Sequence, residues 1–215
     1  PEGLLVAGGF RRKGRGGVAS DVARLDPLER ATVAGLMEQV HDLLEPPPPT
    51  TVGPGSEGPV DEFAAIVAGL GMGVTVAAED QTDLVASGAG RDPALDRLLP
   101  TANLQDDEAA AEFRRLTETG LRQRKAAGLA LAASLLRVED KVVLDEASAR
   151  AFLTALTDVR LVLGERMGLR TDEDLEALEA AAGELDPDDP LGYALAVYDF
   201  LTWFQEILAS AMLTA

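Results

Sequence analysis

The chain contains no cysteine, a single histidine and few aromatic residues. Without cysteine it has no disulfide, no thiolate metal site, no thiol nucleophile and no thiol redox switch of its own. Without a second histidine, one chain also cannot assemble the usual zinc ligand sets or the Glu-x-x-His pairs of di-iron bundles. His41 belongs to no catalytic motif, and we interpret it as an ordinary, partly exposed histidine. We therefore expect no metal site and no cofactor.

Aromatic residues make up only 4% of the chain, so its core must be filled by leucine, valine and alanine, which suits closely packed helices. No uninterrupted apolar run approaches the roughly 20 residues of a membrane helix, and no basic-then-apolar secretory segment opens the sequence. We expect a cytoplasmic protein that does not contact membranes.

Basic residues are outnumbered, and the formal net charge is -18. A body of this sign repels phosphate at long range, which argues against a protein that coats nucleic acid. The exception is a basic stretch of Arg11, Arg12, Lys13 and Arg15. We interpret it as a candidate interaction arm, either solvated or folded against the acidic remainder, with nucleic-acid contact as the lesser alternative. The acidic stretch 172–189 is interpreted as a solvated helix and loop.

We expect one domain over residues 1–215. Its first part, 1–24, is a Gly/Arg-rich arm or a hairpin that turns at residues 14–16. A Pro-rich linker at 45–59 excludes helix and central strand, and a role as ligand for a proline-recognition domain is the lesser alternative. Residues 61–70 are predicted to form a short helix, followed by an irregular stretch at 71–92.

Local signals place the remaining elements. Asp26-Pro27 with Glu29 is a helix start of the capping-box type, and Thr171 with Asp174 repeats it. The predicted fold is mainly α, a compact array of about six helices with a small two- or three-stranded β element near the N-terminus and before the Asp145 helix. Further helices are predicted at 94–99, at 106–136 with a bend near Gly120 or Gly128, at 145–167, at 171–182 and from 189 onward, and a strand at 141–144.

The C-terminal helix is the most informative segment. Its apolar arc covers well over half of the circumference, which predicts a central helix surrounded by others. Asp199, Thr202 and Glu206 share the narrow remaining stripe, because seven residues return Glu206 to within about 20° of Asp199. The apolar arc is formed by Val197, Phe200, Leu201, Phe204, Ile207, Leu208 and Met212.

Two arginines fall on predicted core-facing stripes. Arg160 lies beside apolar positions of the 145–167 helix, and Arg124 is in line with Phe113, Leu131 and Leu135. A partly buried charge without a partner is costly, so we predict that Arg160 pairs with Asp199 or Glu206. The main interpretation of this candidate polar cluster (Arg160, Asp199, Glu206, Arg124) is an internal salt bridge that fixes helix register. The alternative is a small-ligand or enzymatic pocket around Arg160, Asp199 and Glu206.

Catalytic signatures are missing from the sequence. It contains no Gly-x-Ser-x-Gly nucleophile elbow, and its glycine clusters at 14–17 and 71–73 are too short and wrongly placed for a phosphate-binding loop. Paired carboxylates for glycoside chemistry carry little weight, because the acid surplus makes chance pairs common. We therefore assign no catalytic residue and predict a non-catalytic protein.

Several motifs stand out along the chain: Phe10-Arg-Arg, Leu25-Asp-Pro-Leu-Glu29, Leu98-Leu-Pro100, residues 107–118, Thr157-Asp-Val-Arg160-Leu-Val-Leu-Gly164 and Tyr198-Asp199-Phe-Leu-Thr-Trp203-Phe-Gln-Glu206. Together they resemble an actinobacterial domain-of-unknown-function family that is encoded near the ClpS adaptor and also described as the AosR oxidative-stress transcription regulator family. The resemblance begins at Phe10 and fails only in the Pro-rich linker and at 71–92. It implies a cytoplasmic regulator that acts through a protein partner, such as a sigma factor, the transcription machinery or the Clp system. A thiol-sensing role does not transfer to a chain without cysteine, and the oligomeric state stays open, with a homodimer among the options.

Overall fold

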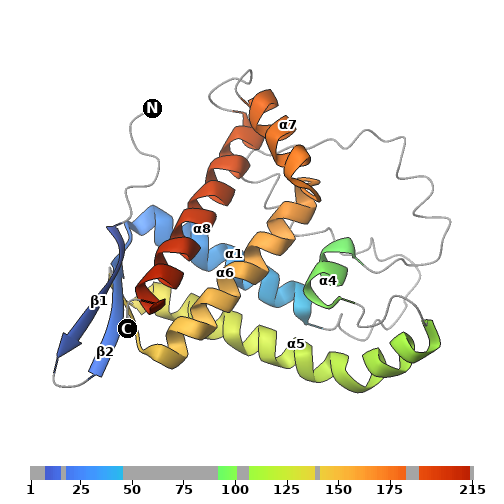
Figure 1. The fold of residues 1–215 in the computed structure, drawn as a ribbon, viewed down its shortest axis with the longest axis horizontal. Coiled ribbons are helices and arrows are strands. Elements are labelled where there is room, and N and C mark those ends of the chain that lie inside the picture. Colours follow the sequence, from blue (N-terminus) through green and yellow to red (C-terminus); the bar gives the residue numbers. More distant parts are fainter. Residues whose placement is uncertain are drawn as a thin grey trace, which may run out of the picture.

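The computed structural model describes residues 8–15, 18–45, 92–100, 107–138, 141–182 and 189–213. These residues form six helices and one three-stranded antiparallel sheet near the N-terminus, which confirms the predicted mainly α fold (Figure 1). Several predicted features lie outside them: residues 1–7 of the arm, the Pro-rich linker 45–59 beyond its first residue, the helix 61–70, the stretch 71–92 before its last residue, and residues 183–188 of the acidic stretch. The elements are β1 (Gly8–Arg15), β2 (Val18–Arg24), α1 (Pro27–Leu44), α4 (Pro93–Leu98), α5 (Asp107–Val138), β3 (Lys141–Leu144), α6 (Glu146–Arg166), α7 (Asp172–Ala182) and α8 (Pro190–Leu213).

Side-chain caps fix the starts of the helices, as the sequence predicts. At α1 the Asp26 carboxylate accepts a hydrogen bond from the Glu29 amide, and the Glu29 carboxylate accepts one from the Asp26 amide, both at 2.8 Å. Each bond satisfies an amide that has no partner within the helix. Thr171 and Asp174 repeat this reciprocal pattern before α7. Single caps start α6 and α8, where Asp145 and Asp189 accept from the amides of Ser148 and Leu191.

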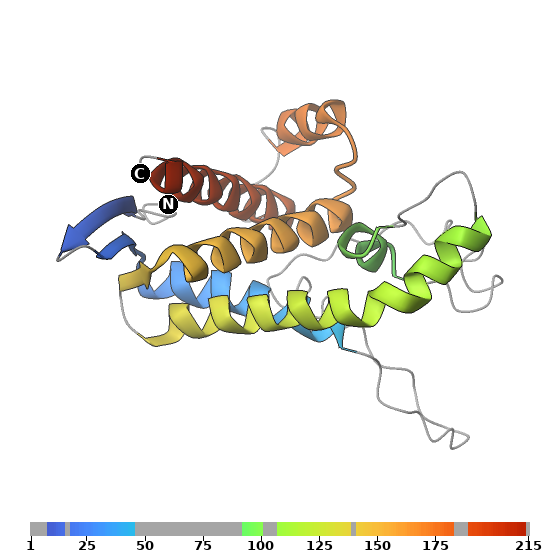
Figure 2. The ribbon, with the colours of Figure 1, turned by 60° about the horizontal axis from the view of Figure 1, so that its bottom comes forward.

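The helices pack in layers around α6. This helix contacts α1, α4, α5 and α8 and also touches β2 and β3. In Figure 2, α1 and α5 lie side by side on one face of α6, and α8 lies on the other. The N-terminal part of α5 turns away from the line of the helix and extends past the end of α1. Among the described elements the central helix is therefore α6, whereas α8 contacts one long helix, α6, together with α7 and the sheet, so the prediction of α8 as the central helix was wrong.

The sheet closes one end of the helical layers. The strand order is β1-β2-β3, so the predicted hairpin of the N-terminal arm and the predicted strand at 141–144 belong to the same sheet. Phe10 of β1 packs against Phe204 of α8 and Phe152 of α6, with ring centroids 4.8 and 6.2 Å apart. Gly9 allows this approach, because a Cβ atom there would lie 3.0 Å from two carbons of Ile207. Phe10 thus anchors the arm in the core.

The buried face of α5 differs from the predicted one. Phe113 and Leu131 are 52% and 44% exposed, and Arg124 is exposed with them, whereas Leu135 of the same predicted stripe is partly buried against the core. The core instead receives Leu129, Ala132, Ala133 and Leu136, a face with i, i+3, i+4 and i+7 spacing. Small alanine side chains let α5 lie close to α1. The stabilisation from this close packing is greater than that from burying the larger side chains of the other stripe.

No described helix combines the length and the apolar content that a bilayer crossing requires.

Candidate functional site

Arg160 forms a polar network between α6 and α8 instead of the predicted ion pair. Its Nη1 donates to Oε1 of Gln205 at 2.9 Å, and its Nη2 lies 3.5 Å from the Tyr198 hydroxyl. The guanidinium also lies over the Tyr198 ring, 5.1 Å from the centroid. Gln205 completes the network by donating to the Thr157 hydroxyl at 3.0 Å. Two guanidinium nitrogens of Arg160 therefore contact neutral polar groups instead of the expected carboxylate, while its buried Nε has no hydrogen-bond partner among the described residues.

Asp199 and Glu206 lie outside this network. Both side chains are exposed, and among the described residues neither forms an ion pair with Arg160 or Arg124. Gln205 takes the place expected for Glu206, because one residue along a helix rotates the side chain by about 100°. Partial burial, together with the nearby Glu179 of α7, raises the pKa of Asp199 above its ordinary value. The predicted pairing of Arg160 with either acid was wrong.

The two acids flank a tryptophan on the outer surface of α8. Trp203 follows Asp199 by four residues and precedes Glu206 by three, so the three side chains are neighbours on one helix face. The indole is 37% exposed, while its rings pack against Phe200 and Phe204 at centroid distances of 5.8 and 6.2 Å. We call Asp199, Trp203 and Glu206 the Trp203 stripe. It presents a fixed aromatic surface between two negative charges.

A buried ion pair joins α5 to α6 at residues that the sequence did not single out. Lys125 donates to Asp158 at 2.5 Å, and the Asp158 side chain is 2% exposed. Burial raises the pKa of Asp158, although Lys125 opposes this change. Lys125 directly follows Arg124, so the internal charge of α5 is displaced by one residue from its predicted position. Asp158 stands in the motif that begins at Thr157, but no motif includes Lys125, and only the correct buried face of α5 could have revealed the pair.

The basic arm divides between structure and surface. Arg12 reaches the C-terminal end of α8, where its Nη1 lies 3.5 and 3.3 Å from the carbonyl oxygens of Ala211 and Met212. A cation at this end of a helix satisfies carbonyls that have no partner and complements the helix dipole. Arg11 and Lys13 are exposed, and the backbone of Arg15 pairs with Val18 at the tip of the hairpin.

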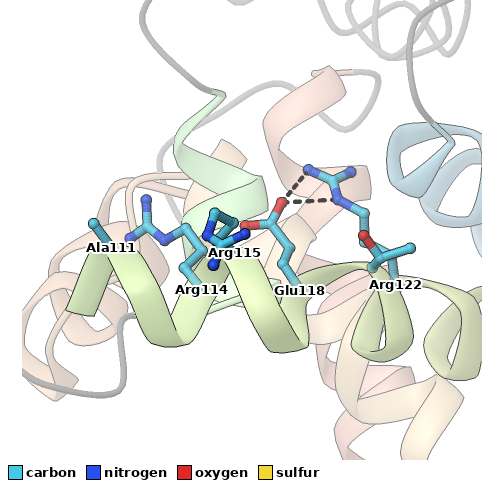
Figure 3. A pocket seen from close by; sticks show the side chains of 6 residues that line it. Ala111, Arg114, Arg115, Glu118 and Arg122 are labelled. Carbon is cyan, nitrogen blue, oxygen red and sulfur yellow. Dashed lines mark hydrogen bonds and ion pairs between the residues drawn. The ribbon is translucent and has the colours of Figure 1, made fainter. Parts of the chain in front are cut away.

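A hollow of about 380 Å³ lies along the projecting part of α5 (Figure 3). Two of its arginines already bind carboxylates: Arg115 contacts Glu112 at 2.7 Å and Arg122 contacts Glu118 at 2.9 Å. Arg122 also donates to the Leu44 carbonyl at the end of α1. These contacts reduce the charge available to an anion, so the hollow is a weak candidate for an anion site. Its lining residues are Ala111, Arg114, Arg115, Glu118, Thr119 and Arg122.

Comparison with known proteins gives one match. The family model described as a domain of unknown function (DUF2017) matches residues 7–212, which covers the described elements from β1 to all but the last residue of α8. No curated protein and no solved structure matches the chain. In the part of the chain that the structure describes, no group of three or more His, Asp or Glu side chains could hold a metal ion. The chain belongs to the DUF2017 family of domains of unknown function.

Proposed function

We propose that this protein is a non-catalytic regulatory protein of the cytoplasm that acts by binding a protein partner. The motif resemblance suggests the finer description: an actinobacterial transcription or stress-response regulator whose partner is a sigma factor, the transcription machinery or the Clp system. The Trp203 stripe is the observation that carries the interaction role.

Two properties make the Trp203 stripe a suitable contact for a protein. Tryptophan is enriched among the residues that dominate binding energy at interfaces. The indole is already held by Phe200 and Phe204, so binding would immobilise little that is free. Asp199 and Glu206 add negative charge on both sides, and an arginine or lysine of the partner would stack on the indole and face the carboxylates.

The alternative of a small-ligand or enzymatic pocket has less support. Arg160 is directed at Gln205 and Tyr198, whereas Asp199 and Glu206 are exposed. The three residues therefore do not converge on one volume where a ligand or a reacting atom could sit.

Affinity capture from the native host, followed by quantitative mass spectrometry, tests the proposal. The wild-type chain and the Trp203→Ala variant serve as baits, and Phe113→Ala is the matched control because Phe113 is an exposed aromatic residue on a different helix. We expect a partner that the wild type and the control retain and that Trp203→Ala loses. Equal recovery with all three baits would contradict a role for the Trp203 stripe.

A further inference from the structure

The three-stranded sheet has one face in the core and one face in solvent. Along β3 the side chains alternate between exposed and buried, and the register places Val143 opposite Val22 and Lys141 opposite Arg24. On β1, Arg11 lies opposite Val22. Because directly opposed residues share a face, the register defines one solvent face. We call it the outer sheet face: Arg11, Lys13, Val22, Arg24, Lys141 and Val143.

The outer sheet face is basic in an acidic protein. Its four cations, Arg11, Lys13, Arg24 and Lys141, are all exposed, against a net charge of -18 for the chain. None of them forms an ion pair with a described residue. The one acid within the three strands, Asp21, is 4% exposed and lies on the core side, opposite Leu144. The positive charge of this face is therefore not neutralised within the described fold.

The arrangement of the cations is costly for the isolated fold. Arg24 and Lys141 are directly opposed in register, and like charges at such positions destabilise a sheet. Between them and the two cations of β1 lie the valines, of which Val143 is 51% exposed. The exposed valines and the cations without an ion pair among the described residues contribute little to the stability of the chain alone. A bound partner would bury the valines under an apolar side chain and pair the cations with carboxylates around it.

We propose that the outer sheet face binds an acidic segment of a protein partner, one in which an apolar side chain lies between carboxylates. The apolar side chain packs on Val22 and Val143, and the carboxylates pair with the surrounding cations. Nucleic acid fits less well. Surfaces that bind it use aromatic or polar side chains where this face has valines, and the charge of the whole molecule repels phosphate. The inference goes beyond the proposed function because it concerns a second surface.

Fluorescence anisotropy with three labelled probes tests this inference on the full chain. The probes are a peptide that alternates glutamate with leucine, a peptide of the same charge that alternates glutamate with serine, and a short DNA duplex. We expect the glutamate-leucine peptide to bind most tightly, with an affinity that falls as salt is added. Tightest binding of the duplex, or no binding of any probe, would overturn the proposal.

Paired variants locate the binding surface. Arg24→Glu combined with Lys141→Glu is expected to weaken peptide binding by about tenfold or more, because two attractive contacts become repulsive. Arg115→Glu combined with Arg150→Glu makes the same change in net charge at exposed positions on other elements and is expected to change binding by less than about twofold. Equal weakening by both doubles would show a general charge effect and overturn the proposal.

Single variants separate this surface from the Trp203 stripe. Val143→Ser is expected to weaken binding several-fold, whereas Val138→Ser, at the exposed end of α5, leaves it unchanged. Trp203→Ala is also expected to leave it unchanged, and a loss there would place the peptide on α8 and overturn the proposal. A second copy of the chain is the other molecule that could cover this face, and sedimentation velocity of the chain alone tests for it. Self-association that is abolished by Arg24→Glu combined with Lys141→Glu would assign the face to a second copy and overturn the proposal.

Discussion

Single side chains at the α6–α8 interface show how the protein accommodates charge. Arg160 is half-buried and held by Gln205 and by the face of Tyr198. Replacing it with methionine preserves much of the apolar contact but leaves the Gln205 carbonyl oxygen without its donor. We expect Arg160→Met to lower the free energy of unfolding by about 1–2 kcal/mol. Urea denaturation measures this, with Arg150→Met as control, since Arg150 is exposed on the same helix. A loss no larger than that of the control would contradict the role of the network.

Phe10 gives a second prediction at the residue scale. It is 6% exposed and contacts Phe152 and Phe204, so it joins β1 to α6 and α8. Phe10→Ala is expected to lower the free energy of unfolding by about 3–5 kcal/mol, the range for a buried aromatic residue. Phe113→Ala, at a 52% exposed site, should cost far less in the same denaturation experiment. Similar losses for the two variants would mean that the arm is not part of the core.

Residue identities alone could not predict which partner Arg160 takes. The helical wheel correctly separates the acidic stripe of α8 from its apolar arc, but it does not set the rotation of α8 relative to α6. A rotation of about 100° exchanges Glu206 for Gln205 as the neighbour of Arg160. That rotation is set by how Phe204 packs with Phe10 and Phe152, which is a tertiary property.

At the scale of elements, the starts of the helices were predictable because their signals are local. Asp26 and Glu29 cap each other across one turn, and no other part of the chain is needed for this. We expect Asp26→Ala to lower the free energy of unfolding by about 1 kcal/mol. Chemical denaturation measures this loss, with Asp42→Ala as the control because Asp42 is an exposed acid at the other end of α1. An equal effect of the two substitutions would contradict the capping contribution.

The buried faces of the helices were less predictable than their ends. The sequence offers α5 two stripes, and the structure buries the one with Ala132 and Ala133 and exposes the one with Phe113 and Leu131. Hydrophobicity alone favours burial of the stripe with the larger side chains, whereas the face of α5 that is actually buried depends on how closely α1 approaches. The buried face of α8 was also hard to predict, because its wide apolar arc packs against both α6 and β1.

Ion pairs attach α4 to the end of α6, and they predict a pH dependence. The Glu165 carboxylate binds Arg97 of α4 at 2.7 Å and Arg170 at 3.3 Å, and the hydrogen bond from Arg97 is the main cause of its lowered pKa. A lowered pKa in the folded state means that this stabilisation is present at neutral pH and is lost as the pH falls through the lowered value. Glu165→Gln should therefore destabilise the protein by about 1–2 kcal/mol at neutral pH.

The same substitution should make little difference in acid, where Glu165 of the wild type is protonated. Thermal denaturation from neutral to acidic pH measures both limits, with Glu112→Gln as an exposed control. A difference between wild type and Glu165→Gln that does not change with pH would contradict the assignment.

At the scale of the whole molecule, charge is segregated. The outer sheet face carries four cations that pair with no acid among the described residues, whereas α7, which has no buried residue and lies away from the sheet in Figure 1, carries acids. Composition predicts the excess of acid but not this segregation, because Arg24 and Lys141 are far apart in sequence and meet only through the pairing of β2 with β3. A molecule with separate basic, acidic and aromatic surfaces suits contact with partners better than chemistry at a single centre.

The most direct test of the proposed function is the dissociation constant of the captured partner for the purified chain, measured by calorimetry for the wild type, Trp203→Ala and Phe113→Ala. Because exposed tryptophans at interfaces often contribute about 2 kcal/mol or more, we predict that Trp203→Ala weakens binding by at least about tenfold. Phe113→Ala should bind like the wild type. An unchanged dissociation constant for Trp203→Ala would contradict the proposal that this protein acts through the Trp203 stripe.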